Sequence, residues 1–192
     1  AEGLSDLLYW CPKCNSEHSM VSKGNTIWCT DCGNGAIVDD TFSLTPLDED
    51  SIIFETQSDW FKKQRENAKK EVEKEDFSFS VNVKLGTLPD YKLLNKAKTS
   101  EITGEGTVTI NKQGLTFKGV NNGEDLEFTI ESKDLPTYGM CTDVSRFYTF
   151  VNGEFVEFYP EHRVVEKFFL ATEELHRLNG GKWKDFDFDP QG

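Results

Sequence analysis

The fold is decided by Cys11-Pro-Lys-Cys14 and Cys29-Thr-Asp-Cys32-Gly33, two cysteine pairs with two residues inside each pair. Fourteen residues separate the pairs, a spacing that is typical of structural zinc sites. Two thiolates three positions apart can bind one metal ion from a tight turn, and two such turns complete a tetrahedron. Four sulfur donors favour Zn²⁺ and leave no open coordination position for catalysis. We therefore expect Cys11, Cys14, Cys29 and Cys32 to hold a structural zinc ion.

The residues around the cysteine pairs predict a zinc ribbon that covers residues 1–50. Residues 20–22 and 26–28 have the pattern of two short strands around a Gly-Asn turn, and residues 36–38 form a third strand. The apolar residues 4–10 suggest a leading strand that packs on the ribbon, whereas the acidic residues 39–50 are typical of a surface loop. His18 is an alternative metal ligand, but the complete set of four cysteines favours an exposed histidine near the site.

A linker helix is expected within residues 51–76. Ser58 or Asp59 can serve as its N-cap, and Trp60 and Phe61 begin an intermittent apolar side. Helices of this kind can lie on a membrane surface, but here the glutamates nearly cancel the lysines. The pattern favours a solvated helix whose two aromatic residues dock onto a neighbouring part of the protein.

Residues 77–179 predict a second unit that consists of strands followed by a helix. Alternating apolar and polar residues, with turn residues between them, predict the strands 77–85, 106–110, 115–118, 126–130, 147–151 and 154–159. Apolar residues then recur every three or four positions over 164–178, which predicts a helix with one buried face. The expected fold is therefore mainly β with some α, an antiparallel β-barrel closed by a C-terminal helix. Residues 180–192 are expected to form a tail.

Composition limits the classes of function. The net charge of the 192 residues is −13, and residues 1–50 contain nine acidic and two basic residues. Four thiolates around one Zn²⁺ would add about two further negative charges. Nucleic-acid binding depends on clustered lysines and arginines, so this balance argues against nucleic acid as a partner.

Cysteine usage and hydropathy indicate the compartment. Paired cysteines in a chain without a secretion signal indicate metal binding in a reducing, cytoplasmic environment rather than disulfides. No apolar run is long enough for a transmembrane helix, and the chain begins without an initiator methionine, which suggests a fragment or a processed form. Cys141 has no companion His or Asn pattern, so we interpret it as a small buried side chain rather than a nucleophile.

Several short motifs resemble one family. They include Leu8-Tyr9 before the first cysteine pair and Asp59-Trp60-Phe61, together with Phe158-Tyr159-Pro160, Val165-Glu166-Lys167 and Leu170-Ala-Thr-Glu-Glu-Leu175. The sequence resembles the C-terminal region of bacterial, mostly Gram-positive, proteins whose N-terminal domain is similar to 1-acylglycerol-3-phosphate acyltransferases. The succession of strands that ends in a helix also resembles the PH or GRAM-like fold. The resemblance implies a cytoplasmic location, with peripheral contact at the inner face of the cell membrane.

The chain departs from the acyltransferase family at its catalytic motif. That motif is a histidine followed by four residues and an aspartate, where the carboxylate orients the histidine as a base. At that offset the three histidines lead to Lys23, Lys167 and Gly181. The resemblance therefore implies a non-catalytic accessory or regulatory region, whose partner is an N-terminal catalytic domain before Ala1. The alternative is a stand-alone zinc-ribbon adaptor that binds another protein.

The resemblance also raises the question of anionic lipid. Lys92, Lys96 and Lys98 lie in a segment that connects two predicted strands, and His162 and Arg163 precede the predicted C-terminal helix. Both groups are candidates for contact with a phospholipid headgroup. The competing interpretation is that these cations belong to ordinary solvated loops.

Overall fold

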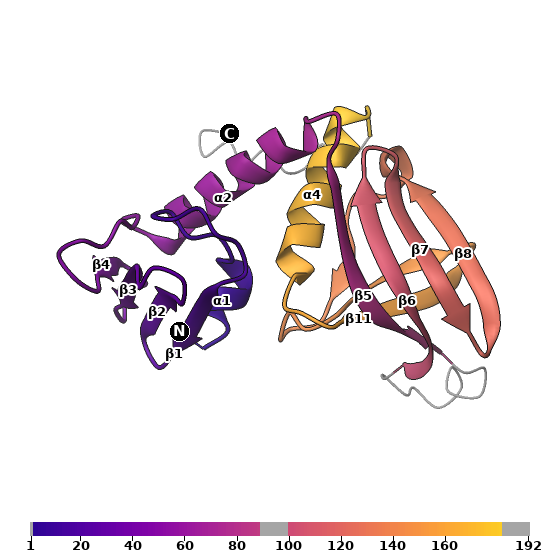
Figure 1. Cartoon of the computed structure of the whole chain (residues 1–192), viewed down its shortest axis with the longest axis horizontal. Coiled ribbons are helices and arrows are strands. Elements are labelled where there is room, and N and C mark those ends of the chain that lie inside the picture. Colours follow the sequence, from indigo (N-terminus) through magenta and orange to yellow (C-terminus); the bar gives the residue numbers. More distant parts are fainter. Residues whose placement is uncertain (1, 89–99, 182–192) are drawn as a thin grey trace.

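The computed structural model describes residues 2–88 and 100–181. Within these ranges the chain forms a four-stranded sheet near its N-terminus and a seven-stranded sheet that follows it. Figure 1 shows helix α2 (Gln57–Val72) running from the first sheet towards helix α4 (Val165–Leu178), which covers one face of the second sheet. The predicted mainly β architecture with some α-helix is confirmed.

The four-stranded sheet forms the ribbon. Its antiparallel strands lie in sequence order, and they are β1 (Met20–Lys23), β2 (Thr26–Cys29), β3 (Gly35–Val38) and β4 (Leu44–Pro46). The predicted leading strand is wrong, because residues 4–7 form the short helix α1 (Leu4–Leu7). Strand β4 was predicted as loop. It forms because the Asp39 carboxylate accepts hydrogen bonds from the backbone of Thr41 and Ser43 and so turns the chain back along β3.

The N-cap of helix α2 lies two residues before Ser58 and three before Asp59, the two predicted positions. Thr56 is the N-cap, and its hydroxyl oxygen accepts a hydrogen bond from the backbone N–H of Asp59 at 3.1 Å. The Thr56 hydroxyl in turn donates to the Asp59 carboxylate at 2.7 Å, so both residues stabilise the first turn. Trp60 is fully buried in the ribbon core, and its indole N–H donates to the carbonyl of Trp10 at 3.0 Å. The helix is therefore anchored to the ribbon at its N-terminal end.

The second sheet is antiparallel and has the strand order β8-β7-β6-β5-β11-β10-β9. Two of its hairpins turn through Asn-Gly pairs, Asn122-Gly123 and Asn152-Gly153, whose positive φ angles match tight two-residue turns. The strands are β5 (Ser78–Thr87), β6 (Glu101–Asn111), β7 (Gly114–Asn121), β8 (Glu124–Glu131), β9 (Gly139–Met140), β10 (Phe147–Val151) and β11 (Glu154–Pro160).

The expected closed barrel is wrong. Strands β8 and β9 lie at opposite edges of the sheet and do not pair with each other, so the sheet is open. The chain between these strands contains the 3₁₀ turn η1 (Ser132–Asp134) and Pro136, and β9 has only two residues. A strand of that length cannot form a ladder with the eight residues of β8 and close the sheet.

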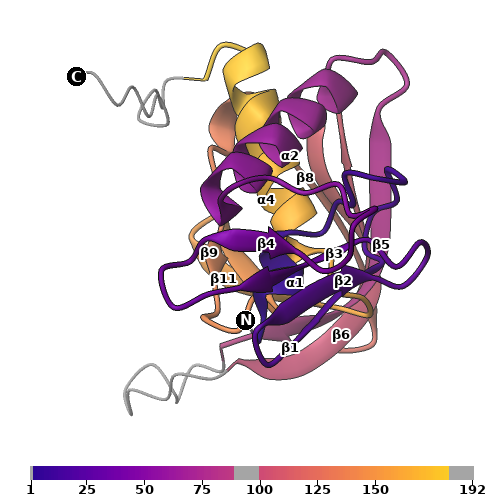
Figure 2. The same ribbon diagram turned by 90° about the vertical axis from the view of Figure 1, so that its left-hand side faces the viewer.

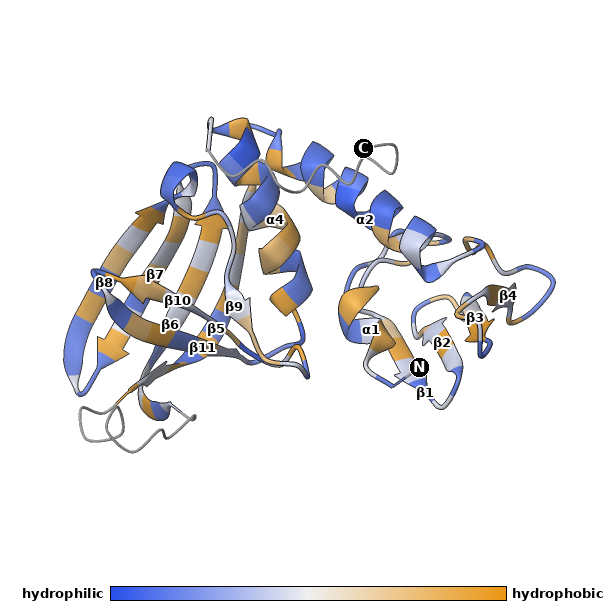
Figure 3. Ribbon diagram, turned by 180° about the vertical axis from the view of Figure 1, so that it is seen from behind, coloured by the Kyte–Doolittle hydropathy of each residue, from blue (hydrophilic) through white to orange (hydrophobic). Residues whose placement is uncertain are grey.

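Helix α4 is buried on two sides, which explains why a helix with several charged residues is almost wholly buried. One side packs against the inner face of the open sheet, where Phe168 and Leu175 join Phe117, Phe147 and Phe158 in the main core. Figure 3 shows the alternation of apolar and polar residues along β6 to β8 that supplies this inner face. The other side of α4 faces α2, which lies beside it in Figure 2.

Among the helices of the described ranges, none is both long enough and apolar enough to span a membrane.

Candidate metal centre

Two turns of the same design bring the four predicted cysteines together. In the first, the backbone N–H of Asn15 donates to the carbonyl of Cys11 at 2.9 Å; in the second, that of Gly33 donates to the carbonyl of Cys29 at 2.9 Å. Asn15 and Gly33 both have a left-handed backbone, with φ of 62° and 74°. Asn and Gly are the residues that tolerate this conformation best, so the sequence permits both turns.

The sulfur atoms form a compact cluster. All four lie within 4.8 Å of one another, with 3.6 Å between the sulfurs of Cys11 and Cys32 and 3.7 Å between those of Cys14 and Cys29. A tetrahedron of sulfurs about 2.3 Å from a zinc ion has edges of about 3.8 Å. The cluster therefore has the size and the donor set of a metal site that binds its ion through four thiolates.

Polar groups around the sulfurs hold the turns in place. The buried Asn34 side chain exchanges two hydrogen bonds with the backbone of Ile52, at 2.7 and 2.8 Å, and its amide also points at the Cys11 sulfur at 3.8 Å. The hydroxyl of Ser16 lies 3.0 Å from the sulfur of Cys14. Such outer contacts orient thiolate ligands and partly neutralise their charge.

Without a metal ion the cysteines differ in acidity. Burial raises the pKa of Cys11 to about 12. The pKa of Cys14 is lowered to about 6, mainly by the hydrogen bond from the Ser16 side chain. Metal binding requires all four thiols to lose their protons, so affinity is expected to fall as the pH falls.

His18 has a structural position that the sequence did not reveal. The predicted exposed histidine is wrong, because the ring is only partly exposed and both of its nitrogens are buried. Its ring stacks on Tyr9 at a centroid distance of 4.9 Å and lies 6.1 Å from the ring of Phe79 in β5. Burial, followed by the nearby Lys167 ammonium, lowers the pKa of His18 to about 4. His18 thus joins the ribbon to the second sheet as a neutral ring.

Lys167 joins three parts of the chain. Its ammonium group binds the carboxylate of Glu17 in the ribbon and that of Glu71 in α2, the latter at 3.1 Å, although Lys167 itself lies in α4. The same ammonium lies 4.6 Å from the ring centre of Phe79. The Lys167 side chain is only 6% exposed, so these contacts form away from bulk water. Nothing in the helical pattern of the sequence identified this lysine.

A second polar contact joins α2 to α4. Arg65 binds the carboxylates of Glu173 and Glu174, at 2.8 and 3.3 Å. Glu166 lies on α4. Its burial and the nearby Glu173 charge raise the pKa of Glu166 to about 7. Gln64 adds hydrogen bonds to the backbone of Leu7 and Trp10. Ribbon, α2 and α4 are therefore connected by specific polar contacts as well as by apolar packing.

The predicted lipid-contact residues are not gathered at one site in the described parts of the chain. Lys92, Lys96 and Lys98 lie outside the described residues, as does nearly all of the predicted tail. His162 is exposed in the turn before α4. Arg163 forms an ion pair with the buried carboxylate of Asp6, which again ties the ribbon to the second unit.

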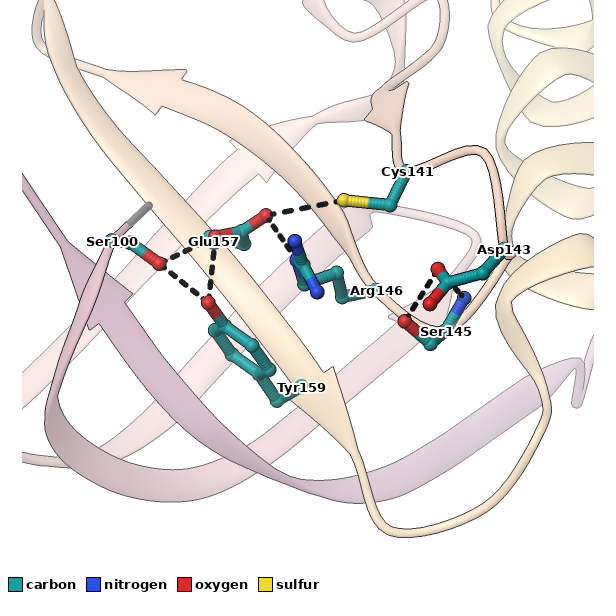
Figure 4. A network of polar contacts seen from close by, with 7 residues as sticks. All are labelled: Ser100, Cys141, Asp143, Ser145, Arg146, Glu157 and Tyr159. Carbon is teal, nitrogen blue, oxygen red and sulfur yellow. Dashed lines mark hydrogen bonds and ion pairs between the residues drawn. The ribbon is translucent and has the colours of Figure 1, made fainter. Parts of the chain in front are cut away.

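Cys141 belongs to a separate polar network on the outer side of the second sheet (Figure 4). The network centres on the buried carboxylate of Glu157, which accepts hydrogen bonds from Arg146 at 3.0 Å, from Tyr159 at 2.9 Å and from Ser100. The Cys141 sulfur lies 3.8 Å from the same carboxylate, and burial raises its pKa. Cys141 is half-buried rather than fully buried as predicted, and its thiol contacts a carboxylate instead of an apolar core.

Comparison of the chain with protein-family models, with curated proteins and with solved structures gave no match.

Proposed function

We propose that the cysteine cluster is a structural zinc site in a non-catalytic accessory region of a larger glycerophospholipid acyltransferase-like protein. The observation that carries the zinc proposal is the closed set of four thiols. Four thiolates fill a tetrahedral shell, so the ion would have no position for water or substrate. Its role would be to stabilise the ribbon, whose core is too small to be stable without support.

The accessory role rests on the family resemblance and on the way the ribbon is attached. Contacts of Lys167 with Glu17 and of Arg163 with Asp6 join the ribbon to the second unit, and Arg65 joins α2 to α4. A rigid two-part region of this kind can hold a catalytic domain in a defined position through protein contacts. In the described residues the second unit keeps the order of strands followed by a helix on which the resemblance to PH or GRAM-like folds rests, although its sheet is open.

Metal analysis tests the zinc proposal. Purified chain is expected to contain close to one zinc ion per molecule, and the double variant Cys29→Ser, Cys32→Ser is expected to contain none. Cys141→Ser is the matched control and should keep its zinc, because Cys141 lies in the separate network around Glu157. Unchanged zinc content in the double variant would refute the ligand set.

The reading frame upstream of Ala1 tests the accessory role. A continuous frame that encodes the His-Asp acyltransferase motif would support the proposal, whereas a start codon at this point would overturn it. In the longer protein, acyl transfer to a 1-acylglycerol-3-phosphate should fall when the two cysteines are replaced. The chain by itself should show no turnover, and measurable transfer would contradict a non-catalytic role.

Membrane contact is the less constrained part of the proposal. Arg163 is largely exposed but already paired with Asp6, so a lipid phosphate would have to compete with a carboxylate for it. Flotation with vesicles that contain anionic phospholipid, with Arg163→Gln as the comparison, measures this contact. Absence of wild-type binding would remove the headgroup assignment and leave the protein-contact role.

A further inference from the structure

The outer face of the ribbon sheet carries apolar side chains beside Lys23, Thr26 and Thr45, although it points away from the ribbon core. Ala36 and Val38 of β3 are buried in that core, so the intervening Ile37 points to the opposite face. Trp28 pairs with Gly35 and with Val21, which places these residues in one row across three strands. Paired residues of antiparallel strands share a face, so Trp28 and Val21 lie on the same side as Ile37.

Leu47 extends this row across β4. Its backbone N–H donates to the carbonyl of Gly35 at 3.0 Å, and a Cβ atom placed on Gly35 would lie 3.0 Å from the Leu47 side chain and 2.9 Å from Cβ of Trp28. Trp28 and Leu47 therefore close over the glycine from two sides. Ile37 and Leu47 are 37% and 40% exposed, so the row is accessible to solvent. We define the docking face as Val21, Trp28, Ile37 and Leu47.

The second sheet shows what a solvated face looks like in the same chain. The outer faces of β5 to β8 carry hydroxyl pairs across neighbouring strands, Ser80 with Thr109 at 2.7 Å and Thr116 with Thr129 at 2.9 Å, and the ion pair of Lys84 with Glu105. An exposed sheet face that instead presents neighbouring aliphatic and indole groups is typical of a surface that another molecule covers.

Charge selects the kind of molecule. Exposed acidic residues border both ends of the docking face, with Asp39 and Asp40 following β3 at one end and Asp31 and residues 48–50 at the other. The basic residues of the first fifty are Lys13, whose ammonium donates to the Asp50 carbonyl, and Lys23, which pairs with Thr26 on the same side of the sheet as the docking face; the acidic residues of the border outnumber them. A second copy of this chain, anionic lipid and nucleic acid would all be repelled by such a border. A basic partner would gain from it.

We infer that the docking face binds a protein segment in which apolar side chains are flanked by lysines or arginines. The apolar groups would cover Trp28, Ile37 and Leu47, and the flanking cations would pair with the acidic border. This inference rests on the proposed role of the ribbon in protein contacts and names the surface and the partner chemistry. It requires neither acyl transfer nor an acyltransferase partner.

The test uses the full zinc-loaded chain and a synthetic probe, the acetylated peptide Lys-Lys-Leu-Leu-Lys-Lys-Leu-Leu-Lys-Lys. Titration by nuclear magnetic resonance should shift the amide signals of β1 to β4 that carry the docking face. Calorimetry should show affinity that falls at least tenfold between 50 and 300 mM salt, because the border charges are screened. A comparison peptide with serine in place of leucine should bind at least tenfold more weakly.

Two variants locate the contact. Ile37→Ser, Leu47→Ser should weaken peptide binding at least tenfold while the zinc content stays unchanged. Phe150→Ser is the control, because Phe150 is 61% exposed on the second sheet, away from the ribbon. Equal effects of the two replacements, signal shifts confined to other strands, or equal binding of the serine peptide would each overturn the inference. Concentration-dependent dimerisation through this face would overturn it in favour of a second copy. The readouts that decide the inference are peptide affinity, amide shifts and dimerisation, and none of them measures acyl transfer. Zinc content serves only as the control for an intact ribbon, so failure here is distinguishable from failure of the proposed function.

Discussion

Replacing Lys167 with methionine should show how strongly the ribbon is held to the second unit. The variant keeps most of the length of the apolar stem but removes an ammonium group that binds Glu17 and Glu71 at once. Two carboxylates would then face each other without the cation between them. We expect the metal-loaded variant to be much less stable than the wild type.

The structure sets the size of the effect. Loss of one partner from a buried ion pair costs about 3–5 kcal/mol, because the remaining charge stays desolvated. Here the lysine is 6% exposed but the two carboxylates are 31% and 32% exposed, so water can partly solvate them in the variant. We therefore expect the low end of this range, a decrease of about 3 kcal/mol in the free energy of unfolding. For a protein of this size that corresponds to a melting temperature about 6–12 °C lower.

Denaturation by guanidinium chloride, followed by circular dichroism at constant free zinc, measures this loss. Lys63→Met is the matched control, since the ion pair of Lys63 with Glu66 on α2 is well exposed and should contribute less than about 1 kcal/mol. Adding Glu17→Gln and Glu71→Gln to Lys167→Met should recover much of the stability. A loss no larger than that of the control, or no recovery in the triple variant, would refute the reasoning.

Removal of the metal by a chelator should strip the amides of β1 to β4 of protection from hydrogen exchange while those of β5 to β8 keep it; equal loss in both sheets would contradict a stabilising role confined to the ribbon. As the pH falls from 7 to 4, His18→Asn should lose about 2 kcal/mol less stability than the wild type. The lowered pKa of His18 means that the neutral ring stabilises the folded state fully above about pH 6.5, and this stabilisation is lost as the pH falls from there to about 4. As the pH falls from 7 to 4.5, Glu166→Gln should lose about 3 kcal/mol more stability than the wild type. The raised pKa of Glu166 means that its protonated carboxyl stabilises the folded state fully below about pH 4.3, and this stabilisation is lost above pH 7. Opposite signs in the unfolding curves would refute either assignment. Gly35→Ala should weaken zinc retention against a competing chelator, since the added Cβ would lie 2.5 Å from a carbonyl oxygen of β2; unchanged retention would show that the strands can move apart.

Local patterns in the sequence predicted most individual elements. The Asn152-Gly153 pair predicted the hairpin of β10 and β11, and the helical spacing of apolar residues over 164–178 predicted α4. The N-cap of α2 was misplaced, because Ser58 and Asp59 are also good caps and only the hydrogen bonds of Thr56 identify the first turn. The three residues of β4 were too short a run to be distinguished from a loop.

The open sheet could not be predicted in the same way. Strand count and alternation are the same for an open sheet and for a barrel, and the difference depends on whether two edge strands pair. The short β9 and the packing of α4 on the inner face decide this, and both involve residues far apart in the sequence.

The sequence by itself determined the cysteine cluster, because each pair of ligands lies within one tight turn and the turn residues Asn15 and Gly33 are local. Only the tertiary structure decided the junction of the two units. There His18, Lys167 and Glu71 come from three different parts of the chain, and their environment depends on burial rather than on local pattern. The local sequence pattern does not distinguish a buried lysine from an exposed one. They differ in what packs around them, which the fold alone supplies.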